Sequence, residues 1–153
     1  MHLGGEDFDN ILVIYCIEEF KKRKGIDLLK EEVNSREISR IKYHCEKAKK
    51  ELTFNDATVI EIESLFKGND LILEITRAKF EKLCDKIFNS IIIPINEVLN
   101  IAKEKRDNID EIILVGGSTR IPKIQRYYKN FSPGKNINNI LNPDEAVAYG
   151  ATI

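Results

Sequence analysis

The amino-acid sequence predicts an α/β fold in a chain of 153 residues. Apolar residues recur at helical spacing in several segments, and a period-two alternation runs through residues 58–75. A short apolar run at residues 112–115 then leads through two glycines into another helical segment. Two helices and a hairpin are therefore expected to precede a strand–helix alternation. The boundary between these two patterns of secondary structure lies near residues 76–85. This length suits one domain or two small subdomains that share a helix.

The first half is expected to contain two helices and an antiparallel hairpin. Acidic residues open the first helical segment and a basic run closes it before Gly25, as the helix dipole favours. The turn Gly68-Asn69-Asp70 separates two alternating runs. The predicted elements are helices over residues 7–24 and from Asn34 or Ser35 to about Leu52, and strands over residues 58–63 and 71–75.

The second half is expected to begin with a long helix from Thr76. Pro94 interrupts the apolar pattern of that helix and is predicted to kink it, or to divide it before residues 98–105. The remaining predicted elements are a strand over residues 112–115, a helix over residues 121–131, a loop over residues 132–141 and a last helix that starts at Asn142.

Composition excludes several classes of function. The 24 basic and 25 acidic residues nearly cancel, so no basic field for nucleic acid or a membrane surface is expected. No apolar run approaches the length of a membrane helix, and no secretory segment is visible. Cys16, Cys45 and Cys84 form neither a CxxC pair nor a cluster with histidine, which favours buried reduced thiols on helix faces and a reducing compartment.

The segment "EIILVGGSTRIPK" contains a sharp turn between a strand and a helix. Gly116 and Gly117 allow the backbone to turn and to approach a ligand closely. Ser118 or Thr119 is predicted to cap the next helix, and Pro122 suits its first turn, so that the helix start would attract an anion. The alternative is a tight turn with an ordinary cap.

A polar stripe on the second helix is the next candidate. Glu46, Lys49, Lys50 and Thr53 lie at helical spacing on one face, away from the apolar face, and together could grip a ribose and a base. The alternative is a solvated face with a Glu46–Lys50 ion pair. The chain has two further glycine- or cap-rich helix starts, one after Gly4-Gly5 and one at "NPDE". With the start after Gly116-Gly117 they make three, which is more than a simple globular domain needs.

Five collinear motifs give the chain a family resemblance: "HLGGEDFDN", "CEKAKKELT", "ITRAKFEKLC", "LVGGSTRIPK" and "NPDEAVAYGA". In order and approximate spacing they resemble the nucleotide-binding domain of the seventy-kilodalton heat-shock chaperones over essentially the whole chain. The resemblance implies an actin-like ATPase, ribonuclease H-like fold, of which the chain covers most of lobe II. It further implies an outer subdomain over residues 5–83 and part of an inner α/β subdomain over residues 84–153.

The resemblance also implies contacts with adenine nucleotide. Glu46 and Lys49 match positions that bond the ribose hydroxyls, and Gly117 and Ser118 match the loop near the phosphates and adenosine. Arg120 matches an arginine that lies against the adenine ring, as a planar guanidinium can. The remaining matched positions are Gly5, Lys50, Thr53 and Asp144.

Two of these positions depart from the family pattern. Lys50 stands where the family usually has arginine, and Thr53 stands where it usually has serine. Thr53 keeps a hydroxyl group, whereas Lys50 lacks a flat stacking surface. Adenine is therefore expected to be held more weakly, or in a different position, than in the family.

The family's function supplies the remaining expectations. They are ATP or ADP as ligand, Mg²⁺ in the complete domain, and ATP-driven protein folding with nucleotide-exchange factors and J-domain co-chaperones as partners. Unfolded peptides would be bound only through a substrate-binding domain absent from this chain. A cytoplasmic location is expected, with an organellar relative left open, and a role with neither nucleic acid nor membrane.

No catalytic residue and no metal ligand is expected in this chain. The resemblance places the catalytic lysine and the residues that position water and metal upstream of a motif like "HLGG". Phosphoryl transfer requires metal, phosphate and nucleophile to be held together, so the chain alone is not expected to hydrolyse ATP.

Two alternatives remain from other classes of protein. The first is a non-catalytic interaction module that docks exchange factors or co-chaperones, with the strands over residues 58–75 and the helix over residues 7–24 as its contact surfaces. The second is another actin-like enzyme, such as a sugar or acetate kinase, against which the five motifs argue. Residues 76–83 are expected near a hinge between subdomains.

Overall fold

The computed structural model describes residues 4–30, 35–131, 136–138 and 142–152. The chain divides into two compact units, Met1–Asp85 and Lys86–Ile153. Among the described residues, no helix has both the length and the apolar character needed to cross a bilayer. The assignment of residues 5–83 and 84–153 to outer and inner subdomains stays a prediction.

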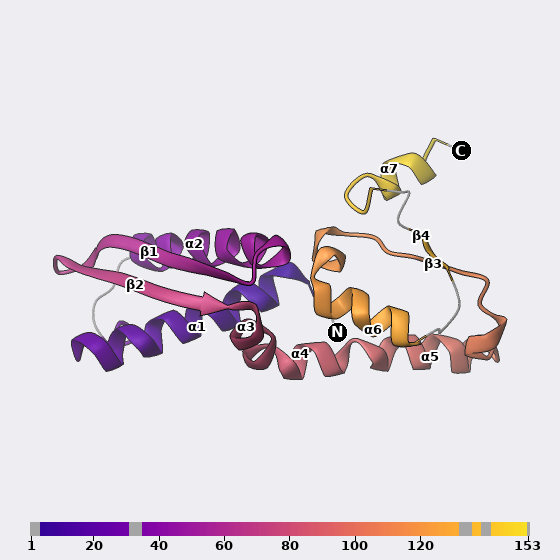
Figure 1. Ribbon diagram of the computed structural model, residues 1–153, viewed down its shortest axis with the longest axis horizontal. Helices are drawn as coiled ribbons and strands as arrows, with labels where there is room; N and C mark the ends of the chain where they lie inside the picture. The colour runs from indigo at the N-terminus through magenta and orange to yellow at the C-terminus, as the bar shows by residue number, and fades with distance from the viewer. Residues whose placement is uncertain (1–3, 31–34, 132–135, 139–141, 153) are drawn as a thin grey trace. The chain divides into compact units, whose positions relative to one another are not determined.

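The elements in chain order are shown in Figure 1. The first unit contains α1 Gly5–Lys24, α2 Ser35–Phe54, β1 Ala57–Phe66, β2 Asn69–Thr76 and α3 Arg77–Leu83. Helix α4 Asp85–Ser90 follows, and then come α5 Ile92–Ala102, β3 Glu111–Ile113, α6 Pro122–Phe131, β4 Asn136–Asn138 and α7 Ala146–Gly150. Two short 3₁₀ helices are η1 Arg106–Asn108 and η2 Gly117–Arg120.

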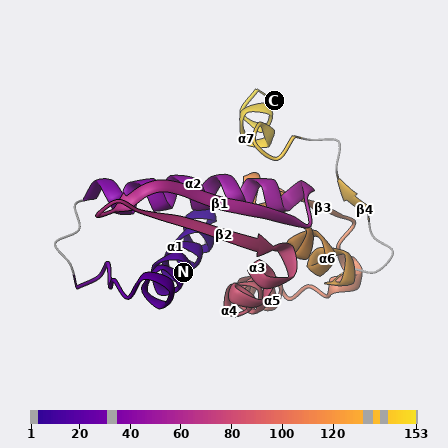
Figure 2. The same ribbon diagram turned by 60° about the vertical axis from the view of Figure 1, so that its left-hand side comes forward.

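The first unit is a two-stranded antiparallel hairpin whose inner face lies against α1 and α2 (Figures 1 and 2). The pairing runs from Ala57↔Thr76 to Ile62↔Leu71 and becomes irregular before Phe66↔Asn69. Side chains alternate between buried and exposed along both strands. The predicted hairpin is therefore confirmed, and its alternation places one apolar row against the helices.

The core of this unit is built from all of its helices and strands. The Phe8 and Phe80 ring centroids lie 6.1 Å apart and join α1 to α3. Each fully buried side chain of this size contributes on the order of 2 kcal/mol to folding. The other buried apolar residues of the unit include Leu12, Phe20, Ile41, Ala48, Leu52, Ile60, Ile62, Leu71, Leu73 and Ile75.

All three cysteines are free, buried thiols, as the sequence predicts. The sulfur atoms of Cys16 on α1 and Cys45 on α2 lie 3.7 Å apart. The hydrogen bond with Cys16, together with burial, raises the pKa of the Cys45 thiol, so this group is protonated at neutral pH. Cys84 caps the C-terminal end of α3 rather than lying on a helix face.

Arg77 fixes the C-terminal end of α2. Its Nε donates to the Leu52 carbonyl oxygen at 2.8 Å and its Nη2 to the Asn55 carbonyl oxygen at 2.9 Å. Its Nη1 lies 2.8 Å from Asp56 Oδ1. These carbonyls belong to the helix end, where acceptors lack intrahelical donors and where positive charge is favourable. One guanidinium therefore ties the end of α2 to the start of α3.

The second unit contains a parallel pair of strands. β3 and β4 pair from Glu111↔Asn136 to Ile113↔Asn138. The prediction of a loop over residues 132–141 is therefore wrong for residues 136–138, because parallel pairing with a distant strand leaves no local turn signal. The rest of that predicted loop lies outside the described residues. Phe88, Leu114, Ile121, Ile124 and Phe131 are buried in this unit.

The helix predicted from Thr76 is interrupted twice. α3 ends at Leu83, α4 covers Asp85–Ser90 and α5 runs from Ile92 through Pro94 to Ala102. The break thus comes before Pro94 and not between it and Val98, which corrects the prediction. Proline has no amide hydrogen to donate to the carbonyl four residues earlier, that of Ser90, and its ring clashes there. A proline in the first turn of a new helix avoids both costs.

In the second unit, the turns before α6 and α7 are longer than the sequence predicts, so both helices begin after the residues predicted to cap them. Ser118 and Thr119 lie inside η2, so neither caps α6, which begins at Pro122 as its first residue. Asn142 accepts a hydrogen bond from the Asp144 amide at 3.2 Å, but α7 begins only at Ala146. Side-chain bonds of this kind stabilise turns in competition with the helix.

Replacing Arg77 by alanine is expected to lower the free energy of unfolding by roughly 2 kcal/mol, because the carbonyls at the end of α2 lose their charged donors. Lysine should restore only part of the loss, since one ammonium cannot reproduce the fork of donors. Urea unfolding followed by circular dichroism measures both variants.

Arg36→Ala is the matched control, since Arg36 is an exposed arginine at the other end of α2. Its effect should stay within about 0.5 kcal/mol. Equal losses from Arg36→Ala and Arg77→Ala would contradict the capping role of Arg77.

Candidate functional site

The nine predicted contact residues fall into two sets, one in each unit. The set in the first unit, here called the α1–α2 cluster, contains Gly5, Glu46, Lys49, Lys50 and Thr53. The set in the second unit, here called the glycine-loop cluster, contains Gly117, Ser118, Arg120 and Asp144. Each cluster has its own internal bonds.

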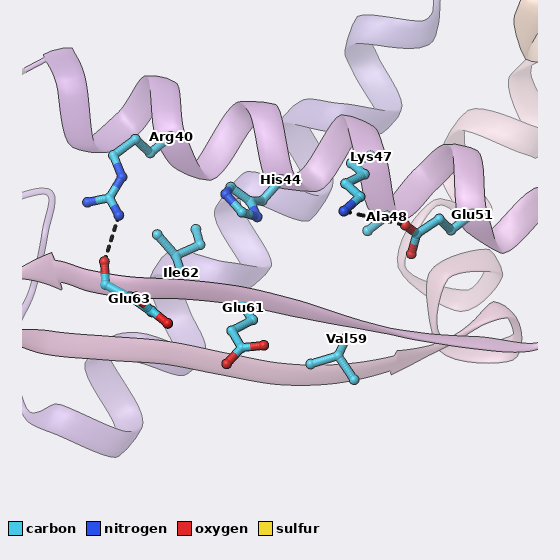
Figure 3. A pocket seen from close by; sticks show the side chains of 9 residues that line it. All are labelled: Arg40, His44, Lys47, Ala48, Glu51, Val59, Glu61, Ile62 and Glu63. Carbon is cyan, nitrogen blue, oxygen red and sulfur yellow. Dashed lines mark hydrogen bonds and ion pairs between the residues drawn. The ribbon is translucent and has the colours of Figure 1, made fainter.

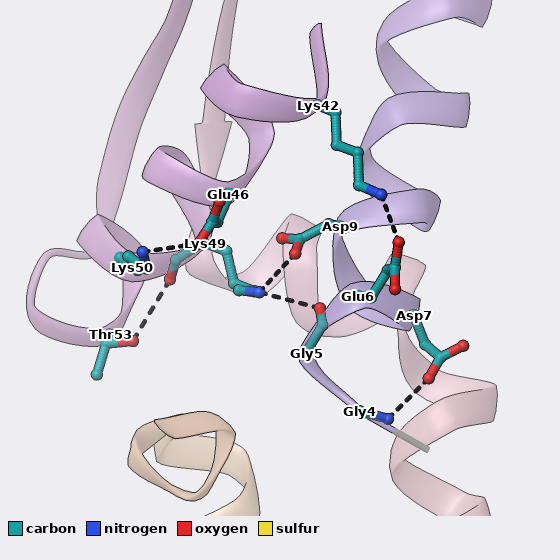
Figure 4. A network of polar contacts seen from close by, with 10 residues as sticks. All are labelled: Gly4, Gly5, Glu6, Asp7, Asp9, Lys42, Glu46, Lys49, Lys50 and Thr53. Carbon is teal, nitrogen blue, oxygen red and sulfur yellow. Dashed lines mark hydrogen bonds and ion pairs between the residues drawn. The ribbon is translucent and has the colours of Figure 1, made fainter. Parts of the chain in front are cut away.

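Lys49 is the centre of the α1–α2 cluster (Figure 4). Its ammonium donates to the Gly5 carbonyl oxygen at 2.9 Å and to Asp9 Oδ2 at 2.7 Å. The Lys49 side chain is only 12% exposed and that of Asp9 only 8%. Two matched residues that are 44 positions apart in sequence, Gly5 and Lys49, are thereby joined directly.

Glu46 and Lys50 lie on the solvent side of α2. Lys50 Nζ is 2.7 Å from Glu46 Oε1, and both side chains are largely exposed. The hydrogen bond from Lys50 lowers the pKa of Glu46, and the same bond raises the pKa of Lys50. The ion pair that the sequence offered as an alternative is therefore formed, while Lys49 of the same stripe turns toward α1 instead.

The N-terminus of α1 is held by its own acidic residues. The Gly4 amide donates to Asp7 Oδ2 at 2.8 Å, which satisfies one donor beside the helix start. Glu6 forms an ion pair with Lys42 of α2 at the surface. Thr53, at the other end of the stripe, is half-buried, and its hydroxyl lies 3.4 Å from the Lys49 carbonyl oxygen, a long hydrogen bond.

The glycine-loop cluster depends on one glycine conformation. Gly116 has φ +93, a value that residues with a Cβ rarely adopt. Its amide donates to the Pro143 carbonyl oxygen at 2.8 Å, and its carbonyl oxygen accepts from the Thr119 hydroxyl at 2.7 Å. The turn after β3 is thereby fastened to the segment that leads into α7.

Arg120 joins the same two segments through its side chain. Its Nη2 donates to Asn142 Oδ1 at 2.7 Å and to Asp144 Oδ2 at 2.9 Å. A Cβ at Gly117 would lie 3.2 Å from Asp144 Oδ1, so this glycine permits the close approach. Within the described residues, the Arg120 bonds use one of its three nitrogens, which leaves Nε and Nη1 as donors.

A groove between α2 and β1 was not predicted from the sequence (Figure 3). Its volume is about 450 Å³, and its lining residues are Arg40, His44, Lys47, Ala48, Glu51, Val59, Glu61, Ile62 and Glu63. Arg40 closes one end by donating to the Glu63 carbonyl oxygen at 2.6 Å. Burial lowers the pKa of His44, and the nearby Lys47 and Arg40 lower it further.

Asp9 was likewise not predicted from the sequence to be part of a site. The sequence shows it only as one of three acidic residues at a helix start, where the dipole alone explains it. Its pairing with Lys49 depends on how α1 and α2 pack, and no spacing within one helix reveals that contact.

The whole chain is similar to one family of known proteins. The family model described as Hsp70 protein matches residues 1–153. Heat shock cognate 70 kDa protein 3 of Dictyostelium discoideum is 48% identical over 152 residues, which cover 99% of this chain and 24% of that protein.

Two further relatives cover the same region. Heat shock 70 kDa protein of Neurospora crassa is 49% identical, over 99% of this chain and 23% of its own length. A ribosome-associated molecular chaperone of Zygosaccharomyces rouxii is 45% identical, over 99% of this chain and 24% of its own length. The chain thus spans about a quarter of the length of the curated relatives it matches.

The groove histidine is expected to make stability depend on pH. Because the pKa of His44 lies below its ordinary value of 6.5 in the folded chain, the unfolded chain binds this proton more readily. The free energy of unfolding should therefore decrease, by the contribution of His44, as pH falls from about 6.5 through the folded pKa. Proton NMR titration in a His2→Gln background, which leaves one histidine, measures that pKa.

His44→Gln should flatten the pH dependence of unfolding in this window. Glu61 and Glu63 of β1 and the cations Arg40 and Lys47 line the same groove and remain in the variant. A titration midpoint for His44 at or above 6.5 would contradict the buried, cation-facing environment.

Proposed function

Because the chain belongs to the Hsp70 protein family, we propose that it contributes contacts to the adenine-nucleotide site of a chaperone ATPase. The family has the actin-like ATPase fold, and the mixed α/β architecture agrees with it. The proposal extends to ATP-driven protein folding by the whole protein, of which the chain spans about a quarter.

The contact between Lys49 and Gly5 is the observation that carries the proposal. Both residues match nucleotide-contacting positions of the family, and the Lys49 ammonium lies 2.9 Å from the Gly5 carbonyl oxygen. Glu46 lies one turn earlier on α2 and offers carboxylate acceptors, while Lys49 offers ammonium donors. Ribose hydroxyls can both donate to the first group and accept from the second.

The glycine-loop cluster supports the same ligand. Arg120 has a planar guanidinium that is anchored at one nitrogen by Asn142 and Asp144. A guanidinium held in this way can stack on an adenine ring. It loses less conformational freedom on binding than a guanidinium without such bonds. Gly117 is exposed and has no Cβ to obstruct a ligand that approaches the backbone.

The described residues fit the adenosine part of the ligand better than its metal. Among residues 4–30, 35–131, 136–138 and 142–152, no group of three or more possible metal ligands occurs. We propose that Mg²⁺ binds through the phosphates in the complete domain, where it would neutralise phosphate charge. Hydrolysis is likewise proposed for the complete domain and not for the chain alone.

A second candidate function is docking of nucleotide-exchange factors or co-chaperones. The groove between α2 and β1 supports it, because charged residues of both signs lie beside the exposed Val59 of β1. Ile72, on β2, is also exposed. A mixed apolar and charged surface of this kind suits a protein partner. Retained binding of an exchange factor together with absent ADP binding would favour this function.

The proposal also covers the partners of the whole protein, its location and the alternative of a kinase. J-domain co-chaperones and unfolded peptides would engage the whole protein. A cytoplasmic location is proposed from the three free thiols, which suit a reducing compartment. The family match over residues 1–153 leaves no support for a sugar or acetate kinase.

Titration of ¹⁵N-labelled chain with ADP and Mg²⁺, followed by NMR, tests the nucleotide proposal. Shift changes are expected at Glu46, Lys49, Gly117, Ser118 and Arg120. Cytidine diphosphate is the control, since it keeps the ribose and phosphates but lacks adenine. Silence of all five residues at millimolar ADP, in a folded spectrum, would overturn the proposal for this chain.

Lys50→Arg is expected to tighten ADP binding about two- to fivefold, because a guanidinium stacks on adenine better than an ammonium does. Lys47→Arg is the matched control. Lys47 lies on the same helix and is 64% exposed against 70% for Lys50, but it is not part of the polar stripe. Calorimetric titration compares the two variants, and equal affinities for both would argue against adenine near position 50.

A further inference from the structure

The ion pair between Lys49 and Asp9 is costly for a contact that only joins two helices. Both side chains are about nine-tenths buried, and removing two charges from water offsets most of their attraction. An apolar pair of similar volume would often stabilise a fold as well or better. The pair therefore calls for a reason beyond the stability of α1 against α2.

The second oxygen of Asp9 adds to this cost. Within the described residues, Asp9 Oδ1 is buried and has no hydrogen-bond partner, while Oδ2 is 2.7 Å from Lys49 Nζ. A buried acceptor without a donor costs about 1–3 kcal/mol. Among the residues that the structure describes, the carboxylate is thus held by one bond, and that bond is to the lysine that matches a ribose-contacting position.

The geometry of the ammonium shows what the pair achieves. An ammonium has three N–H donors, and Lys49 uses two of them on the Gly5 carbonyl oxygen and on Asp9 Oδ2. Two fixed acceptors determine the direction of the third N–H. A long, flexible lysine side chain is thereby restrained before any ligand arrives, which reduces the loss of freedom on binding.

The surface pair between the same two helices provides the contrast. Lys42 of α2 and Glu6 of α1 also form an ion pair, but their side chains are 46% and 70% exposed. Such a pair contributes at most about 1 kcal/mol and orients nothing. The two lysines therefore meet α1 in different ways, and only Lys49 is both buried and doubly anchored.

We infer that Asp9 is a positioning residue for nucleotide binding: it anchors the Lys49 ammonium so that its remaining N–H is directed at a hydroxyl or phosphate oxygen of the ligand. Asp9 acts through Lys49 and not by touching the nucleotide, since its free oxygen is buried. This inference rests on the proposed function of the α1–α2 cluster.

The test compares ADP affinity in four variants of the whole chain by calorimetric titration. Asp9→Asn keeps the shape of the side chain but removes its charge, and it should weaken ADP binding about tenfold. Glu6→Gln, which removes the surface ion pair between the same helices, should bind like the wild type. Lys49→Met should bind at least as weakly as Asp9→Asn.

The double variant Asp9→Asn/Lys49→Met separates positioning from an independent effect. If Asp9 acts through Lys49, the double variant should bind no more weakly than Lys49→Met alone. The ¹⁵N signal of the Lys49 ammonium provides a second measurement. It should shift on addition of ADP in the wild type and in Glu6→Gln, and should not shift in Asp9→Asn.

Several results would overturn the inference. Wild-type affinity in a folded Asp9→Asn chain would show that the anchor is not needed, and fully additive losses in the double variant would show that Asp9 does not act through Lys49. Failure of the wild type itself to bind ADP would remove the proposed function as well, so the two failures are distinguishable.

Asp9→Glu serves as the conservative variant if Asp9→Asn does not fold. It keeps the negative charge beside Lys49 but moves it by one methylene. Its ADP affinity should fall between those of the wild type and Lys49→Met. An affinity equal to that of the wild type would show that the position of the carboxylate does not matter and would overturn the inference.

Discussion

The contact of Lys49 with Asp9 and with the Gly5 carbonyl oxygen is the constraint on which the first unit's polar surface depends. It lies near the start of α1, whose fifth residue is Asp9. Lys49 turns toward α1, while Glu46 and Lys50 lie on the solvent side of α2 and pair with each other. The packing of α1 against α2 thus divides a stripe of four polar residues.

The rest of the first unit keeps that contact in place. The Phe8 and Phe80 rings pack α1 against α3, and Arg77 bonds the carbonyls at the C-terminal end of α2. The hairpin covers both helices with one apolar row. Binding residues on helices with fixed ends are positioned more accurately than residues on loops. In the glycine-loop cluster, side-chain bonds fix the positions of the residues instead, since Arg120 donates to Asn142 and to Asp144.

Sequence patterns predicted the parts of this structure that depend on local spacing. Periodicity located α1, α2 and the hairpin, and helical spacing alone brought Glu46 within reach of Lys50. The contacts that the sequence did not predict join segments that are far apart along the chain. Parallel pairing of β4 with β3 and the approach of Asp9 to Lys49 depend on packing between elements. Pro94 was recognised as a disruption, but the helix breaks before it, between Ser90 and Ile92, so that Pro94 lies in the first turn of α5.

Lys49 and Lys50 show how adjacent residues of one type acquire different roles. A rotation of about 100° per residue along α2 separates their side chains, so one is anchored against α1 while the other remains in solvent. An anchored ammonium offers a directed hydrogen bond, whereas an exposed one offers mainly charge. The less accessible of the two lysines is therefore the one whose hydrogen bonds have a fixed direction. The chemistry of the site is set by the neighbours of each lysine and not by the number of lysines.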